Sequence, residues 1–229
     1  YTRLDSQGID LNRDVLDKKA PESRLLQEVL KNFDPDYCFN MHDQRTIFSV
    51  GSPPKPATLS FLAPSEDEER SLTPGRIRTM EVIVAMFDAL KNDLKEGVGR
   101  YTDEFYPAAT GDNFQRMGYS TILIESGHFK GDYRRRQTRK YTFLALVSGL
   151  LHIAHDTEEN YKTYFDIPDN EKFYLDRIVK NVRIGDERGD MGVYFKETLA
   201  DEQVRFLPTL EKFEDLSEYG ADEIISGDH

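Results

Sequence analysis

The sequence predicts an α/β fold built on a mixed, mostly parallel sheet with helices on both faces. Three short apolar runs, rich in β-branched or aromatic residues, have the length and composition of buried strands: 37–41, 58–62 and 119–124. Three segments with apolar residues at helical spacing alternate with these runs. Because strands that alternate with helices are typical of α/β domains, we expect this class.

The helical segments are placed by prolines and by the spacing of apolar residues. Thr73, which precedes a proline, is expected to cap the second segment, and that helix is expected to run to about Gly97. The third helix is predicted at 141–155. Pro21 suits the first position of the first helix, whose expected core face is Leu25, Leu26, Val29, Leu30 and Phe33.

The composition becomes more charged beyond Asp156, which divides the chain into two expected parts. Residues 1–156 are predicted to form the main domain, and residues 157–229 a small C-terminal α+β extension. Within the extension, residues 170–182 are compatible with a short helix. Two runs that alternate apolar and polar residues predict a hairpin, at 191–197 and 203–208.

Charge and composition exclude several classes of function. The 229 residues carry a formal net charge of −12, whereas nucleic-acid binders concentrate basic charge on one face. No run approaches the roughly 18 apolar residues of a membrane span, so we expect a soluble protein, cytoplasmic or exported. The single cysteine, Cys38, excludes an internal disulfide. Neither nucleic acid nor membrane is therefore an expected partner, and the oligomeric state stays open.

Polar residues with chemical potential occur at three places in the chain. Arg3 precedes the box Gly-Ile-Asp-Leu-Asn-Arg, which contains Asn12 and Arg13. The predicted strand at 37–41 leads into His42, and the strand at 119–124 ends on Glu125. Open α/β sheets bind ligands at the carboxyl ends of their strands, so a carboxylate there suggests a site. The alternative is that Glu125 only caps a strand and pairs with an arginine.

Taken in order, these residues resemble the zinc carboxypeptidases of the carboxypeptidase A type over roughly residues 1–155. The Asp-Leu-Asn-Arg box is the most specific part of the resemblance. The resemblance implies a zinc cofactor with His42 as one ligand. In that family the other two ligands form a His-x-x-Glu pair upstream of the box. We therefore expect this chain to be the C-terminal part of a longer catalytic domain, and alone to bind zinc poorly and to be inactive.

The resemblance also implies a role for each of the other residues. Glu125 would be the general base and Arg3 would polarise the scissile carbonyl. Asn12 and Arg13 would hold the terminal carboxylate of the substrate, and a planar guanidinium suits a carboxylate because it donates two parallel hydrogen bonds. Tyr106 is the candidate for the mobile tyrosine of the family, although its loop is shorter than the family pattern. A structural ion pair of Arg13 with a neighbouring aspartate is equally compatible with the spacing.

Three functions follow from these observations. The first is a metallocarboxypeptidase that removes C-terminal residues from peptides by means of a zinc-activated water. The second is an acyl-amino-acid amidohydrolase of the aspartoacylase or desuccinylase type, because such enzymes resemble carboxypeptidases in the Asn-Arg box. The third is a non-catalytic peptide-binding module that has kept the fold and lost the metal site.

Overall fold

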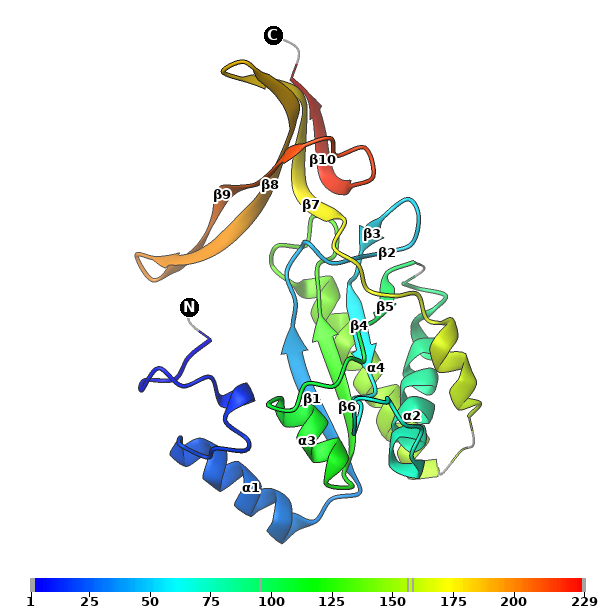
Figure 1. The fold of residues 1–229 in the computed structure, drawn as a ribbon. Helices are drawn as coiled ribbons and strands as arrows, with labels where there is room; N and C mark the ends of the chain where they lie inside the picture. Colours follow the sequence, from blue (N-terminus) through cyan, green and yellow to red (C-terminus); the bar gives the residue numbers. More distant parts are fainter. Residues whose placement is uncertain (1–2, 95, 156, 158, 228–229) are drawn as a thin grey trace.

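The computed structural model describes residues 3–94, 96–155, 157 and 159–227, and it is an α/β structure with mixed sheets, as predicted (Figure 1). The central sheet has the strand order β1-β6-β4-β5. β6 pairs in parallel with β1, β4 pairs in parallel with β5, and β4 and β6 are antiparallel. The bounds of these strands are β1 Tyr37–Asp43, β4 Leu59–Leu62, β5 Val98–Arg100 and β6 Ser120–Ser126. A small antiparallel pair, β2 (Ser49–Val50) and β3 (Lys55–Pro56), lies apart from it.

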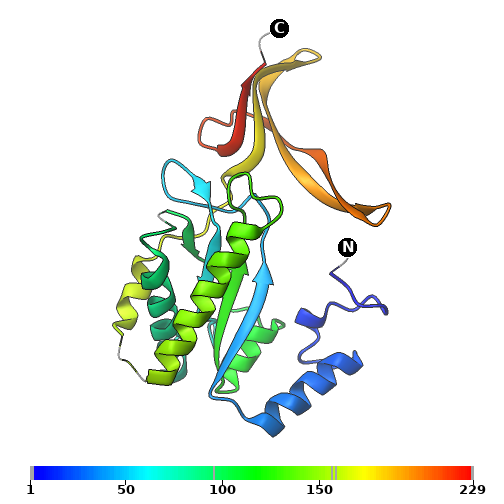
Figure 2. The same cartoon turned by 180° about the vertical axis from the view of Figure 1, so that it is seen from behind.

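Helices cover both faces of the central sheet (Figures 1 and 2). The helices α2 (Pro74–Leu90) and α4 (Arg136–His155) pack on one face, and α3 (Thr110–Arg116) lies on the other with α1 (Pro21–Phe33) further out. The side chain of Thr73 accepts a hydrogen bond from the N–H of Arg76, which confirms the predicted cap of α2. None of the helices within the described residues is long and apolar enough to cross a membrane.

The helix α4 begins five residues earlier than the predicted position 141. Asp132 explains the difference, because its carboxylate accepts hydrogen bonds from the first backbone N–H groups of the helix, at Arg136, Gln137 and Thr138. These N–H groups have no partner within the helix itself, so a carboxylate in this position stabilises an earlier start. The prediction relied on the spacing of apolar residues. The first turn of α4 contains no apolar residue, so this spacing could not locate the start of the helix.

The main core lies between the central sheet and the pair α2 and α4. Phe61, Met80, Ile122 and Ile124 are fully buried there. The short 3-10 helix η2 (Tyr161–Asp166) contributes Tyr164, which is also fully buried and whose hydroxyl accepts a hydrogen bond from the N–H of Ala63 at 3.1 Å. Residues that follow position 157 therefore complete the core of the α/β part.

The expected core face of α1 is wrong in all but one position. Leu30 is buried, but the remaining four apolar side chains are exposed, with fractions from 47% to 78%: Leu25, Leu26, Val29 and Phe33. The helix instead contacts the chain through Ser23, Gln27 and Leu30, and Gln27 donates to the carbonyl of Val15. Helical spacing identifies an apolar face, but it carries no information about which element covers that face.

The C-terminal part is a second four-stranded sheet, with the order β10-β7-β8-β9. The predicted hairpin is confirmed, because β8 and β9 are antiparallel and Lys196 is paired with Leu207. The predicted helix at 170–182 is wrong, since these residues form most of β7. β7 pairs with β10 on one side and with β8 on the other, and its residues Tyr174, Leu175 and Ile178 are buried. This pairing outweighs the local helical pattern. The bounds are β7 Tyr174–Ile184, β8 Glu187–Ala200, β9 Gln203–Glu214 and β10 Gly220–Ser226.

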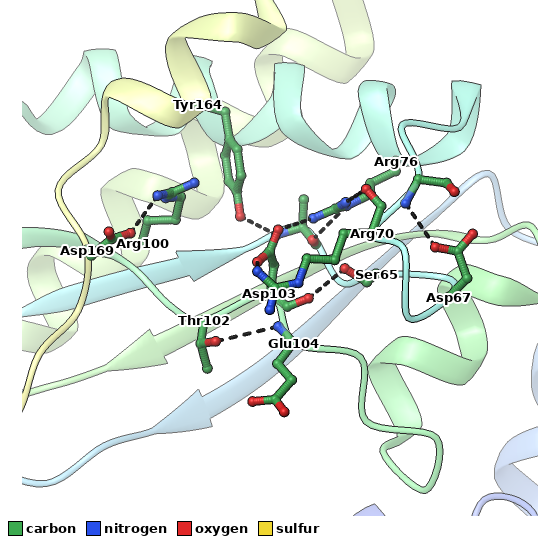
Figure 3. A network of polar contacts seen from close by, with 12 residues as sticks. Ser65, Asp67, Arg70, Arg76, Arg100, Thr102, Asp103, Glu104, Tyr164 and Asp169 are labelled. Atoms are coloured by element: carbon green, nitrogen blue, oxygen red, sulfur yellow. Dashed lines mark hydrogen bonds and ion pairs between the residues drawn. The ribbon is translucent and has the colours of Figure 1, made fainter.

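A buried arginine ties the start of α2 to the loop that follows β5 (Figure 3). The Arg76 side chain is 1% exposed, and its Nη2 lies 2.6 Å from Oδ2 of Asp103. Its other nitrogens donate to the carbonyl oxygens of Arg70 and Ala63, at 2.6 and 3.3 Å. All three nitrogens of the guanidinium group are thus satisfied, as a buried charge requires.

Replacing this arginine should destabilise the fold. Arg76→Met would leave two carbonyl groups without their donor and Asp103 with only its partly exposed partner Arg70, so the free energy of unfolding should fall by about 3 kcal/mol or more. Urea unfolding monitored by circular dichroism measures this change. Arg78→Met is the matched control, because Arg78 is exposed on the same helix and should change stability by less than about 0.5 kcal/mol. Equal effects of the two substitutions would contradict the role of the buried ion pair.

Candidate active site

His42 and Glu125 lie side by side near the carboxyl ends of two neighbouring strands. They are direct partners in the parallel register of β1 and β6. Since successive side chains alternate between the faces of a sheet, His42 shares a face with Cys38, which packs against the cluster of Val15, Leu30 and Phe114. Both side chains therefore project toward the α3 side of the sheet.

The environment of Glu125 changes its acidity. The pKa of its carboxyl is raised to about 7, mainly by burial and in addition by the nearby Asp43, whereas Arg3 opposes the shift. Its Oε2 is buried and has no hydrogen-bond partner among the described residues. Buried polar atoms normally find partners, so an unpaired carboxylate oxygen at a strand end marks a place where a ligand or water can bind.

The surroundings of His42 favour its neutral form. Burial lowers the pKa of the imidazole, and the positive charges of Arg3 and Arg13 lower it further, while Asp43 and Asp10 act in the opposite direction. The neutral imidazole is the form that ligates metals. The same interactions show that both arginines of the N-terminal segment are close to the end of β1.

The N-terminal segment is held by a chain of polar contacts. Arg3 Nε donates to Asp10 Oδ2 at 2.6 Å, and Asp10 Oδ1 accepts from the N–H of Asn12 at 3.0 Å, which starts the 3-10 helix η1 (Leu11–Arg13). The side-chain oxygen of Asn12 accepts from the N–H of Thr110, the first residue of α3, at 3.3 Å. The box is therefore docked on α3, beside the His42 face of the sheet.

Arg13 stacks on Tyr106 and does not form an ion pair with its neighbouring aspartates. Its guanidinium carbon lies 4.8 Å from the centre of the Tyr106 ring, which is 55% exposed, and Nη1 donates to the Asn12 carbonyl. Asp10 binds Arg3, and Asp14 accepts from the backbone N–H groups of Lys19 and Ala20. Asn12, Arg13 and Tyr106 are thus brought together, and the stack leaves an edge of the guanidinium for a ligand.

Tyr101 also belongs to this region, and the sequence interpretation assigned it no role. Burial raises the pKa of its hydroxyl, the negative charge of Glu125 adds to the shift, and Arg13 and Arg3 oppose it. The residue directly follows β5, and its N–H donates to the carbonyl of Phe61 in β4, next to the register partner of Glu125. Only the strand order β6-β4-β5 brings it close, and no local signal in the sequence gives that order.

The donors fit one part of a zinc site. His42 is a suitable ligand, and Glu125 stands beside it with a free oxygen. The part of the chain that the structure describes contains no group of three or more His, Cys, Asp or Glu side chains arranged to hold a metal, whereas a catalytic zinc takes three protein ligands. His128 points elsewhere, since its Nε2 lies 3.0 Å from Asp222.

Comparison with models of protein families, with curated proteins and with solved structures gave no significant match. The resemblance to zinc carboxypeptidases therefore stays an expectation that rests on the order of the sequence motifs.

The raised pKa of Glu125 should be visible in the stability of the fold. Because the pKa rises from 4.5 to about 7 on folding, ionisation opposes folding, and the free energy of unfolding should fall as pH rises between these two values. Glu125→Gln should remove this dependence and stabilise the protein at pH 8 by about 1 to 2 kcal/mol, after allowance for partial exposure. Urea unfolding at several pH values measures it.

Glu28→Gln is the matched control for this experiment, because Glu28 is an exposed carboxylate on α1. That variant should retain the pH dependence of the wild type. If Glu125→Gln retained it as well, the assigned acidity of Glu125 would be wrong.

Proposed function

We propose that the chain carries one half of a metallocarboxypeptidase-type active site, which removes C-terminal residues from peptides by hydrolysis. The observation that carries this proposal is the pairing of His42 with Glu125, whose Oε2 is buried and unpaired. Arg3 and Arg13 influence the same histidine, so two positive groups stand next to a potential base and a potential metal ligand. This set matches the needs of amide hydrolysis: a base, a group that stabilises the oxyanion, and a substrate clamp.

Each residue has a role that follows from its chemistry. Glu125 accepts a proton from the attacking water and returns it to the departing amine nitrogen, which requires a pKa near the working pH. The guanidinium of Arg3 stabilises the negative charge on the carbonyl oxygen during attack. A zinc ion with His42 among its ligands would lower the pKa of its bound water to about 7.

The terminal carboxylate of the substrate would bind at Asn12, Arg13 and Tyr106. The Asn12 oxygen is engaged by Thr110, which turns its amide nitrogen into the available donor. The guanidinium of Arg13 is held in place by the Tyr106 ring, so little side-chain entropy is lost when it binds a carboxylate.

An amidohydrolase that cleaves acyl-amino acids is the second candidate. The clamp recognises a carboxylate and does not depend on a peptide chain beyond the scissile bond, so a free acyl-amino acid also satisfies it. A non-catalytic module that binds peptide C-termini would keep the same clamp without zinc. Hydrolysis and zinc binding by a longer chain separate these alternatives.

The clamp predicts a preference for free C-termini. Arg13→Met should weaken binding of an N-acetyl dipeptide with a free carboxylate by about 10-fold to 100-fold, with little effect on the C-terminally amidated form. Titration calorimetry on this chain measures both ligands. Arg116→Met, an exposed position on the nearby α3, serves as the control. Equal binding of acid and amide by the wild type would contradict the clamp.

The ligand count predicts how zinc binds. This chain should bind zinc weakly, because His42 supplies one of the three donors that a catalytic site uses. A chain extended upstream should bind one zinc tightly and hydrolyse peptides. In that chain Glu125→Gln should keep the zinc and lower kcat by about 100-fold to 10,000-fold. Glu28→Gln should have the zinc binding and the kcat of the wild type. Tight stoichiometric zinc in the short chain, or an extended chain that binds zinc without hydrolysis, would count against the proposal.

A further inference from the structure

A cavity of about 260 Å³ lies between the central sheet and the C-terminal sheet. One wall consists of Asp43, the last residue of β1, and of residues that follow β1 and β6, among them Arg45 and Gly127, and the opposite wall comes from β8 and β9. Figures 1 and 2 show the C-terminal sheet standing beyond the carboxyl ends of β1 and β6. The cavity is therefore formed by both parts of the chain, and no role has been assigned to it so far.

The cavity lies close to the pair His42 and Glu125, although neither of the two residues lines it. Asp43 directly follows His42 and Gly127 lies two residues beyond Glu125. Because a strand advances by about 3.3 Å per residue, the cavity begins within about 7 Å of the pair along the strands. It also borders Asp132 at the start of α4, whereas the clamp residues lie on the α3 side.

If the function proposed above holds, the position of the cavity determines where each part of a bound substrate lies. With its terminal carboxylate at Arg13 and its scissile amide at Glu125, a peptide leaves the pair on the side away from the clamp. The cavity then receives the residue on the acyl side of the scissile bond. Its volume is sufficient for one side chain with its share of backbone.

The walls of the cavity are held in place by one buried carboxylate. Asp176 is 2% exposed, and it accepts hydrogen bonds from the Tyr133 hydroxyl at 2.6 Å, the Phe195 N–H at 2.6 Å and the Thr46 hydroxyl at 3.2 Å. All three donors line the cavity. The Tyr133 ring also packs edge-on against Phe206, with ring centres 5.2 Å apart. The cavity is thus preformed, as expected for a ligand site.

Arg45 is the charged group of the lining that is best placed for a ligand. The guanidinium of Arg45 lies 4.2 Å from the centre of the Tyr194 ring, and among the described residues Arg45 has no hydrogen bond or ion pair to a carboxylate. Lys196 is likewise without an ion pair there, and Arg135 donates to the Ser126 carbonyl only. Stacking fixes the plane of Arg45 and leaves its N–H edge free for two parallel hydrogen bonds to a carboxylate.

Some of the acidic groups around the cavity already accept hydrogen bonds from other residues. Asp132 caps α4, and His128 pairs with Asp222. The lining therefore carries three acidic side chains, Asp43, Asp132 and Glu197, and the three cations named above. Because these charges are equal in number, the case for an anionic ligand rests on Arg45, whose guanidinium has no carboxylate partner among the described residues.

We propose that this cavity binds the side chain of the residue on the acyl side of the scissile bond, and that Arg45 selects an acidic side chain there. The chemical class of the substrate is then a peptide or acyl-amino acid that carries one carboxylate at its end and a second on the acyl side.

The test uses this chain and small ligands, with amide chemical shifts in NMR as the readout. The ligands are N-acetyl-glutamyl-alanine, its glutaminyl counterpart, and the C-terminal amide of the glutamyl compound. The glutamyl ligand should bind about fivefold or more tightly than the glutaminyl one and should shift the amides of Thr46 and Gly127. Arg45→Met should remove that preference, whereas Arg134→Met, exposed on the adjacent loop, should retain it.

The two proposals fail in different ways in this experiment. Equal binding of the glutamyl and glutaminyl ligands, or no shift near the cavity up to the solubility limit, would overturn the acidic subsite. A preference for glutamate that survives Arg45→Met would overturn it as well. Loss of discrimination between acid and amide, with glutamate still preferred, would instead reject the clamp at Arg13 and leave the cavity assignment in place.

Discussion

The parallel pairing of β1 with β6 places an imidazole next to a carboxylate, and the rest of the site depends on that pairing. A register shift of one residue would send one of the two side chains to the opposite face of the sheet. The pairing also leaves a carboxylate oxygen buried without a partner, which costs free energy that the surrounding packing must offset. The apolar residues of β6, Ile122 and Ile124, supply part of that packing from the other face.

The sequence predicted the elements better than their arrangement. Strands were predictable because their apolar runs are short and bounded, and the helix starts followed where proline or threonine marked them. The exposed stripe of α1 and the strand β7 were not predictable, because burial and strand pairing are set by distant residues. For the site, the order of the motifs led to the prediction of Glu125, His42 and Arg13 as candidate residues. Tyr101 could not be predicted from the sequence, because its proximity to Glu125 depends on the strand order.

Arginine side chains lie close to both candidate sites of this acidic protein. The chain carries a net charge of −12, yet arginines surround both the His42 pair and the cavity next to it. An acidic surface repels anionic ligands at long range, but screening limits that effect to about 8 Å at physiological salt. Short-range guanidinium groups, partly screened from water by stacked rings, dominate once a carboxylate reaches the crevice.

The loop that follows β6 links Glu125, the proposed base, to the C-terminal sheet. Asp222 of β10 accepts hydrogen bonds from His128 and from the N–H of Gly131, and Asp176 of β7 accepts one from Tyr133. Tyr164 and Ile167, farther along the chain, fill the main core. The C-terminal sheet is therefore not an appendage that evolution or a protein engineer can exchange freely. If another module replaced the C-terminal sheet, this loop would need new hydrogen-bond acceptors. The replacement would also remove one wall of the cavity.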